Sequence, residues 1–312
     1  MDFGLIVHGG AWSIPDQYTS DHTDGVSGAC SLGYELLEKG RDAIDVVEAV
    51  ICLLEDDPTF DAGIGSHFNS NAEVEMDAII ADQNYRIGSV CAIQNIKNPI
   101  RAARLVRDES EHILLAGKGA TDFALTQGLD FTTTETFLIG REKETYERLK
   151  HDTSFSTKDP FKSRKQGFGT VGTVVKDKSG QLAIGVSTGG TPKKLAGRIG
   201  DTPIWGAGGY VQSHGGAAAT GFGEDLMRVL ITSQVVNMIE MGLHPQQAAE
   251  KAIALLEREV SGLGGIITLS QESFGLAFNT KRMAYAVQTS DISLHVGIEP
   301  SDLENLLSST NI

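Results

Sequence analysis

Cysteine is scarce in this 312-residue sequence, which has only Cys30, Cys52 and Cys91. The number is odd and no two of them have the CxxC spacing, so the pattern is typical of reduced core thiols in a cytoplasmic protein and excludes a disulfide framework. None of the eight histidines falls in an HExxH motif or a local cluster. We therefore expect a cytoplasmic protein without a zinc or other transition-metal site.

Basic residues are also few. The sequence has 26 Lys and Arg against 41 Asp and Glu, a formal net charge of −15. An acidic surface repels phosphate backbones, so we expect no nucleic-acid partner. No apolar run approaches the ~20 residues that span a bilayer, and the N-terminus lacks the basic and apolar regions of a secretory signal. Apolar residues nevertheless make up 40% of the chain, enough for a large core in one domain or two.

The first half of the sequence alternates between strand and helix patterns. His8-Gly9-Gly10 predicts a turn where the backbone approaches another segment closely. The stretch 141–166 is strongly polar and is either a helix that fades into a linker or a disordered segment. Apolar periodicity predicts strands at 5–7, 73–80 and 87–93, and helices within 26–55 and at 99–107 and 119–127.

The second half begins with a hairpin. Two alternating runs, 170–176 and 181–188, flank Asp177-Lys178-Ser179-Gly180, which is a strong turn signal. Folding the chain about that turn places Thr170 opposite Ser187 or Thr188, and directly opposed residues have Cβ atoms about 4.5–5.5 Å apart. The spacing alone therefore predicts a second hydroxyl beside Thr170.

The remainder is rich in glycine and then in helices. Residues 185–223 hold twelve of the 36 glycines, which predicts mostly loop built for close backbone approach. The overall pattern indicates sheets covered by helices in a layered α+β fold. We expect helices at 224–241 and 245–258, strands at 266–269, 274–278 and 283–287, and one short peripheral helix after about residue 298.

Gly169-Thr170-Val171-Gly172 combines a polar segment before it with a strand after it. If the Gly169–Thr170 bond were cut, Thr170 would carry a hydroxyl nucleophile and a free α-amine, whose ordinary pKa of roughly 7.7–8.0 suits a base near neutral pH. The alternative is a β-branched residue that fills a strand. The stretch also matches GxGxxG, but a dinucleotide fingerprint follows a strand and opens a helix, and here that context is reversed.

Two glycine-rich clusters further on contain polar residues suited to substrate binding. Arg198 could hold an α-carboxylate and Asp201 an α-ammonium, although the two could equally form a surface ion pair of little energetic value. Thr220 and Gly221 could offer a hydroxyl and a backbone N–H to an oxyanion. Their alternative is an ordinary strand-to-helix turn.

These clusters together resemble the plant-type asparaginase / isoaspartyl peptidase family of N-terminal nucleophile hydrolases, from His8 to about Ala286. Members are made as inactive precursors that cut themselves before the threonine of a GTVG motif. The resemblance implies an α+β fold, a four-layer αββα sandwich. It further implies one domain over 1–312 that is made as a precursor, with an α fragment 1–169 ending in a polar linker at about 142–169, and a β fragment 170–312.

The resemblance also assigns roles by position. Thr170 would be the nucleophile both for cleavage of the Gly169–Thr170 bond and for substrate hydrolysis, and Thr188 would hydrogen-bond to it. The other matches are Arg198 and Asp201 as the substrate clamp, Thr220 and Gly221 as the oxyanion pair, and Gly223 as a contact to the substrate carbonyl.

The segment from Leu54 to Ile64 resembles the family's sodium-binding stabilisation loop. Backbone carbonyls ligate the ion there, and oxygen-only ligation suits a hard cation. We therefore expect a structural Na⁺ and no organic cofactor. By position the carbonyls would be those of Leu54, Glu55, Asp57, Phe60, Ala62 and Ile64.

The sequence departs from the family pattern at two places. Members usually carry asparagine where this chain has Asp61, and an ionised carboxylate accepts hydrogen bonds but cannot donate them. Members often have Met-Thr-Asn-Lys after Ser-Thr-Gly-Gly, whereas this chain has Thr191-Pro192-Lys193-Lys194. Both departures bear on the support of Thr170 and on specificity.

The activity that the resemblance implies is hydrolysis of β-aspartyl amides, namely L-asparagine and isoaspartyl dipeptides, by a dimer of cleaved αβ units. Glycosylasparaginases carry a different sequence at Ser187–Gly190 and lack the pattern at Phe60–Gly65, so both segments favour the asparaginase branch. The alternatives are a glycosylasparaginase-like amidase and an uncleaved, non-enzymatic paralogue that acts as a binding module.

Overall fold

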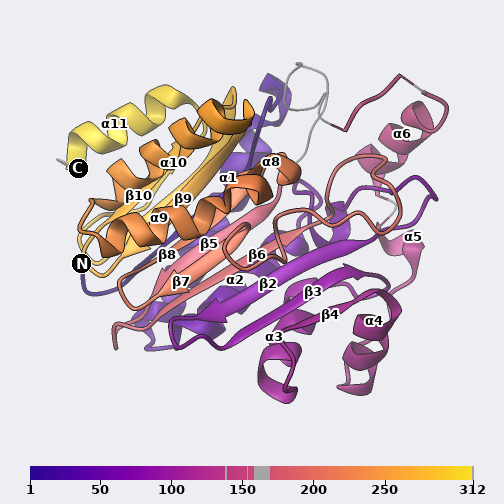
Figure 1. Ribbon diagram of the computed structural model, residues 1–312, viewed down its shortest axis with the longest axis horizontal. Coiled ribbons are helices and arrows are strands. Elements are labelled where there is room, and N and C mark those ends of the chain that lie inside the picture. The colour runs from indigo at the N-terminus through magenta and orange to yellow at the C-terminus, as the bar shows by residue number, and fades with distance from the viewer. Residues whose placement is uncertain (138, 153, 158–168, 311–312) are drawn as a thin grey trace.

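Two stacked sheets form the centre of the molecule (Figure 1). The computed structural model describes residues 1–137, 139–152, 154–157 and 169–310. One sheet has eight strands in the order β12-β11-β1-β5-β6-β2-β3-β4, and the other has four in the order β10-β9-β8-β7. The strands are β1 (Gly4–Trp12), β2 (Met76–Asp82), β3 (Ile87–Ile93), β4 (Leu114–Ala116), β5 (Val171–Lys176), β6 (Leu182–Thr188), β7 (Gly209–Gln212), β8 (Gly215–Gly221), β9 (Gly264–Ser270), β10 (Phe274–Phe278), β11 (Arg282–Thr289) and β12 (His295–Gly297).

Helices cover the outer face of each sheet, so the layers run αββα. The large sheet is covered by α1, α2 and α3, and the small sheet by α9 and α10. The layering confirms the four-layer sandwich. The described helices are α1 (Thr19–Glu38), α2 (Ala43–Glu55), α3 (Pro99–Glu109), α4 (Gly117–Thr126), α5 (Thr134–Phe137), α6 (Gly140–Leu149), α8 (Gly223–Val229), α9 (Ile231–Glu240), α10 (Pro245–Val260) and α11 (Pro300–Thr310), with short 3₁₀ turns at Asp16–Tyr18 and Gly63–Gly65.

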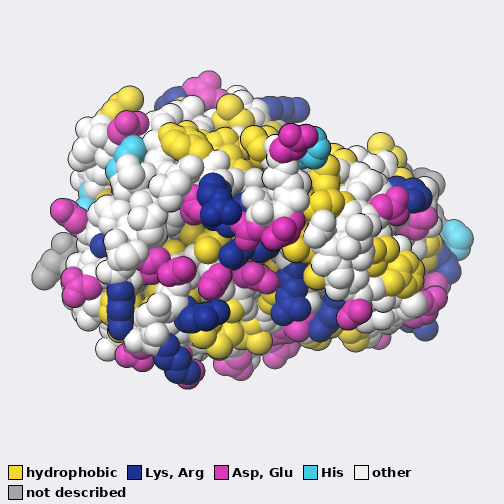
Figure 2. Space-filling model, turned by 90° about the horizontal axis from the view of Figure 1, so that it is seen from below, with side chains coloured by type: hydrophobic (Ala, Val, Ile, Leu, Met, Phe, Trp, Pro, Cys, Tyr) yellow, Lys and Arg dark blue, Asp and Glu magenta, His cyan; other side chains and the backbone are white. Residues whose placement is uncertain are grey.

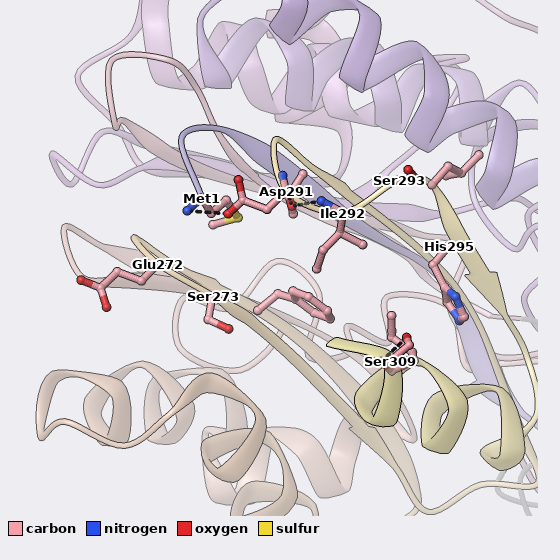
Figure 3. Close-up of a pocket in the computed structure, with 12 residues that line it drawn as sticks. Met1, Glu272, Ser273, Asp291, Ile292, Ser293, His295 and Ser309 are labelled. Carbon is pink, nitrogen blue, oxygen red and sulfur yellow. Dashed lines mark hydrogen bonds and ion pairs between the residues drawn. The ribbon is translucent and has the colours of Figure 1, made fainter. Parts of the chain in front are cut away.

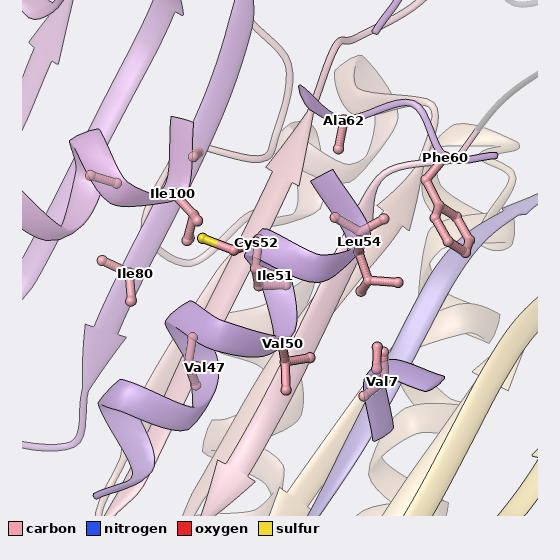
Figure 4. Close-up of a cluster of buried hydrophobic side chains, with 14 of the residues drawn as sticks. Val7, Val47, Val50, Ile51, Cys52, Leu54, Phe60, Ala62, Ile80 and Ile100 are labelled. Atoms are coloured by element: carbon pink, nitrogen blue, oxygen red, sulfur yellow. The ribbon is translucent and has the colours of Figure 1, made fainter. Parts of the chain in front are cut away.

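Each interface between layers has its own apolar core. Figure 4 shows the first, where α2 lays Val47, Val50 and Ile51 on the large sheet. A second core fills the space between the two sheets, with Ile6 and Ile184 from the large sheet and Ile267 from the small one. A third lies under α9 and α10. Since burial of apolar area is the main stabilising term in folding, these three cores hold the four layers together.

Several predicted elements agree with the structure, and the β5–β6 hairpin is the one that matters most. Its strands pair antiparallel, with Val171 opposite Ser187. The predicted strands 87–93 and 274–278 match β3 and β10 at both ends. Of the two alternatives for the polar stretch, residues 140–149 are helical as α6. Residues 153 and 158–168 of the predicted linker lie outside the described residues.

Other predictions are wrong in instructive ways. The predicted helix 224–241 is two helices, because Leu230 adopts a left-handed conformation with φ of 48° between α8 and α9. The glycine-rich region 185–223 is loop and turn over 189–208, as predicted, but its later part contains β7 and β8, and the Ala217–Ala219 run of β8 is fully buried. Small residues suit that strand because it lies between a sheet and a helix layer.

The ends of the chain also differ from expectation. His8-Gly9-Gly10 does not end the first strand, since β1 continues to Trp12 through an irregularity between His8 and Ala11. Gly10 has φ of 99°, a conformation that glycine adopts without steric cost. The C-terminal helix α11 is less peripheral than predicted, because Leu306 is only 1% exposed and joins the core between the sheets.

The surface mixes both signs of charge. On the face shown in Figure 2, Lys and Arg side chains stand among Asp and Glu side chains without forming one continuous basic surface. Among the described residues, no helix combines the length and the apolar character needed to cross a membrane.

Candidate active site

Thr170 lies immediately before β5, in the middle of the large sheet between β1 and β6. Its Oγ1 donates to Thr188 Oγ1 at 3.0 Å, at the end of β6. Both residues are buried, at 8% and 3% exposure. The hairpin therefore places the two hydroxyls side by side, as the turn spacing predicts.

Asp61, in the loop after α2, makes hydrogen bonds through all four of its polar atoms: one to Thr188, two to the neighbouring Gly169 and Gly189, and one to His67. Its backbone N–H donates to the Gly169 carbonyl at 3.3 Å, and its own carbonyl accepts from Gly189 N–H at 2.9 Å. The carboxylate accepts from Thr188 Oγ1 at 3.4 Å through Oδ2 and from His67 N–H at 3.1 Å through Oδ1. Burial raises the pKa of Asp61 to about 6, while nearby His67 and Lys194 favour its ionised form.

His67 connects Asp61 to α6. Its Nδ1 lies 2.5 Å from Glu142 Oε2, and its Nε2 lies 3.9 Å from Asp61 Oδ1. All three side chains are almost completely buried. Nothing in the spacing of His67 and Glu142, 75 positions apart, signals this contact, and the sequence reasoning missed it.

Two glycines let the N-terminal strand approach the nucleophile. A Cβ on Gly10 would lie 2.2 Å from Gly169 Cα, and a Cβ on Gly172 would lie 2.3 Å from His8 Nε2. His8 is fully buried, and burial lowers its pKa to about 3, so the ring stays neutral. The close approach predicted at His8-Gly9-Gly10 is therefore an approach to the Gly169–Thr170 bond.

Thr220 and Gly221 end β8 on the facing sheet. Thr220 is 1% exposed, and its Oγ1 accepts from Ala11 N–H at 3.2 Å. Gly221 has φ of 151°, and a Cβ there would lie 2.6 Å from Gly264 Cα. The hydroxyl is therefore joined to β1, next to the glycines that contact the Thr170 segment.

The Arg198 and Asp201 side chains are not a surface ion pair. Arg198 pairs with Glu224 through two hydrogen bonds, and its side chain is only 15% exposed. Asp201 is 4% exposed; burial raises its pKa to about 7, against the opposing effect of the Arg198 charge. A Cβ on Gly223 would lie 2.9 Å from both Arg198 Nη2 and Asp201 Oδ1. Three predicted binding residues therefore meet at one place. Glu224, the last residue of the glycine-rich cluster Thr220–Glu224, is the partner to which the sequence reasoning gave no role.

The two lysines that follow Ser187–Gly190, of which Lys193 departs from the family pattern, have separate partners. Lys193 Nζ donates to the carbonyls of Leu149 and Asp152, at 2.9 and 2.5 Å, and thus holds the end of α6. Lys194 is 1% exposed and donates to the Glu75 carbonyl at 2.7 Å. The charge at Lys193 therefore serves the α6 segment and does not point to a substrate.

The loop predicted to bind sodium folds tightly on itself. A Cβ on Gly63 would lie 2.2 Å from the Glu55 carbonyl oxygen, and one on Gly65 would lie 1.8 Å from the Phe60 carbonyl oxygen. The carbonyls of Asp57 and Ala62 each accept one backbone N–H, which leaves each a second lone pair. The Leu54 carbonyl is the acceptor for both Asp56 N–H and Asp57 N–H. Within the residues that the structure describes, no group of three or more His, Cys, Asp or Glu side chains could hold a metal ion.

Figure 3 shows a pocket of about 660 Å³ elsewhere on the molecule. Its lining includes Met1, Ser273, Asp291 and His295, and it extends to Ser309 of α11. None of the residues predicted for the active site lines this pocket. This pocket is therefore not the predicted reaction site, which lies around Thr170.

An αββα sandwich with a threonine hydroxyl buried at the start of a central strand, hydrogen-bonded to a second threonine hydroxyl, has the architecture of an N-terminal nucleophile hydrolase. The family model described as "Asparaginase" matches residues 1–298. The chain belongs to this asparaginase family.

Its relatives extend over almost the whole chain. It is 38% identical over 301 residues to the human isoaspartyl peptidase/L-asparaginase, with 96% of each chain covered. It is 37% identical over 297 residues to the Xenopus laevis isoaspartyl peptidase/L-asparaginase, with 94% of each covered. An Escherichia coli isoaspartyl peptidase is 34% identical over 296 residues, which cover 89% of this chain and 90% of that protein.

Proposed function

We propose that this protein hydrolyses β-aspartyl amides, in L-asparagine and isoaspartyl dipeptides, and that Thr170 is its nucleophile after cleavage of the Gly169–Thr170 bond. The observation that carries the proposal is the 3.0 Å contact between the buried hydroxyls of Thr170 and Thr188 at the predicted cleavage point. The names of the relatives, isoaspartyl peptidase and L-asparaginase, support the substrate class.

The substrate would be held by the Arg198–Asp201 pair. Glu224 occupies Nε and Nη2 of Arg198, which leaves Nη1 for the α-carboxylate of the substrate. Asp201, when ionised, would receive the α-ammonium. Gly223, packed between the two side chains, would leave room for the substrate carbonyl. An α-amino acid bound this way extends its side-chain amide away from the clamp.

In the reaction, the free α-amine of Thr170 takes the hydroxyl proton and Oγ1 attacks the side-chain carbonyl carbon. The Thr220 hydroxyl and the Gly221 N–H stabilise the oxyanion. The proton then passes to the leaving nitrogen, and ammonia or an amine departs. Water, activated by the same amine, hydrolyses the aspartyl ester and regenerates Thr170.

We also propose a structural Na⁺ in the loop from Leu54 to Ile64. The carbonyl oxygens of Glu55 and Phe60 lie so close to Gly63 and Gly65 that a Cβ would not fit, and the oxygen-only donor set suits this ion. The bound cation would keep this loop folded against Gly169. A dimer of cleaved αβ units and a cytoplasmic location remain predictions from the sequence.

The decisive experiment compares wild type with Thr170→Ala. Denaturing electrophoresis should show two fragments for wild type, with the smaller one beginning at Thr170 by N-terminal sequencing. The variant should stay one polypeptide and release no aspartate from L-asparagine or an isoaspartyl dipeptide. Splitting of the variant would refute the role of Thr170. A wild-type chain that remains whole would indicate the binding-module alternative, and preferential turnover of a sugar-linked asparagine the glycosylasparaginase one.

A further inference from the structure

The Gly169–Thr170 bond lies inside a ring of hydrogen bonds that passes through Asp61. The Asp61 N–H donates to the Gly169 carbonyl, and the Asp61 carboxylate accepts from Thr188. Thr188 in turn accepts from Thr170. Asp61 therefore contacts the carbonyl that self-cleavage would attack and, through Thr188, the hydroxyl that would attack it.

The ring has a fixed direction. Thr188 Oγ1 accepts from Thr170 Oγ1 and from Gly190 N–H, each at 3.0 Å. Its single proton is then directed to Asp61 Oδ2, since an ionised carboxylate can only accept. The order of donation is Thr170 to Thr188 to Asp61, which leads away from the Thr170 oxygen.

The carboxylate is held so that it can play this part. His67 N–H occupies Oδ1, so Oδ2 is turned to Thr188. Gly189 makes the room, because a Cβ there would lie 2.4 Å from Oδ1. The side chain is 0% exposed, and in such a dry site a hydrogen bond is stronger than in water.

The precursor lacks the base that the mature enzyme uses. Before cleavage the nitrogen of Thr170 belongs to the peptide bond, whereas afterwards it is a free amine. We propose that Asp61 drives self-cleavage: its N–H holds the Gly169 carbonyl, and its carboxylate receives the Thr170 hydroxyl proton through Thr188. The inference rests on the proposed role of Thr170 and concerns only the maturation step.

The step balances as follows. The Thr170 Oγ1 proton moves to Thr188 while the Thr188 proton moves to Asp61, and Oγ1 bonds to the Gly169 carbonyl carbon. The developing oxyanion accepts a hydrogen bond from the Asp61 N–H. As the C–N bond breaks, the same two protons return and the nitrogen of Thr170 takes one, which leaves an ester between Gly169 and Oγ1. Water hydrolyses that ester to the Gly169 carboxyl group and the free Thr170 hydroxyl.

Asparagine at position 61 would reverse the direction of the hydrogen bond between residue 61 and Thr188. Its side-chain oxygen would accept from His67 N–H in place of Oδ1, so its NH₂ group would face Thr188 and donate to it. An amide nitrogen cannot take the proton. Asp61→Asn is thus a nearly isosteric test, and the same backbone N–H to Gly169 is retained.

The experiment follows the loss of the full-length band for freshly refolded wild type, Asp61→Asn and the control Asp56→Asn. Asp56 lies in the same loop and pairs with Lys97 at the surface. General-base assistance typically contributes 10²–10⁴-fold, so Asp61→Asn should mature about a hundredfold more slowly and Asp56→Asn at the wild-type rate. In the matured enzyme the amine of Thr170 is the base, so Asp61→Asn should lower kcat by a much smaller factor than it lowers the maturation rate.

Three outcomes would overturn the proposal: maturation of Asp61→Asn at the wild-type rate, a loss of kcat equal to the loss of maturation rate, or a linear proton inventory. The last is measured on wild-type self-cleavage in H₂O/D₂O mixtures, where two protons moving together give a curved plot. This measurement needs no variant, so it tests the proposal even if Asp61→Asn fails to fold. Melting curves of Thr170→Ala and of the double variant Thr170→Ala/Asp61→Asn would reveal such a folding defect. Cleavage of Thr170→Ala would instead refute the proposed nucleophile.

Discussion

Arg198 and Glu224 face each other through two parallel hydrogen bonds, Nε to Oε1 and Nη2 to Oε2, each 2.8 Å long. Such a fork fixes the plane of the guanidinium as well as its position. The orientation of the third nitrogen, Nη1, is thereby fixed before the α-carboxylate of the substrate binds. Glu224 is a positioning residue for the clamp, and it is the second residue of α8, which begins at Gly223.

Arg198→Lys should therefore weaken substrate binding. Lysine keeps the charge but cannot hold Glu224 and a second carboxylate in one plane. Loss of a hydrogen bond to a charged group costs about 1.5–3 kcal/mol, so KM for L-asparagine should rise roughly 10- to 150-fold. Steady-state kinetics on the matured variant measure this. Arg228→Lys, at an exposed arginine of the same helix that pairs with buried Asp225, should leave KM unchanged, and an equal effect there would contradict the clamp.

Ligand binding should depend on pH through Asp201, whose pKa is raised to about 7 by burial. Below that value the carboxyl is protonated and cannot pair with an ammonium; above it the carboxylate is present. The dissociation constant of the product L-aspartate should fall as pH rises through about 7. Calorimetric titration at several pH values measures binding separately from the chemical step, in which the Thr170 amine acts as the base. Asp201→Asn should bind weakly at every pH, and a variant with the wild-type profile would exclude this role.

Gly172→Ala should destabilise the protein and impair maturation. The new Cβ would lie 2.3 Å from His8 Nε2, and His8 is fully buried. Overpacking of this kind typically costs 1–3 kcal/mol, which lowers the melting temperature by several degrees. Gly28→Ala is the matched control, because nothing lies within 4 Å of its Cβ in α1 and alanine favours helix. Melting curves with the same shift for both variants would rule out the contact with His8.

Lys193→Ala should loosen α6. The lysine bonds to the carbonyls of Leu149 and Asp152, and hydrogen bonds to charged groups contribute about 1.5–3 kcal/mol. Amide hydrogen exchange over residues 140–149 should accelerate roughly tenfold or more. Lys143→Ala, an exposed residue on α6, should not change it. Unchanged exchange in Lys193→Ala would show that His67–Glu142 alone retains the helix.

The sequence predicts those parts of the molecule that depend on local patterns. The turn at Asp177–Gly180 is a local signal, and it suffices to place Thr188 beside Thr170. The Asp61–His67–Glu142 contacts join a loop to a helix from another part of the chain, and no periodicity records such a meeting. β8 escaped prediction because Gly and Ala have little strand preference of their own, and its burial between layers determines its structure.

The order of strands in the large sheet has a consequence for the cut chain. Counted along β11-β1-β5-β6-β2, the strands belong in turn to the second fragment, the first, the second twice, and the first again. Cleavage before Thr170 would thus yield two polypeptides whose strands alternate in one sheet, with three pairs of neighbouring strands hydrogen-bonded between the fragments. To part them would mean dismantling the centre of the molecule. They should therefore elute together at any dilution that leaves the protein folded, as a single body with four chain ends.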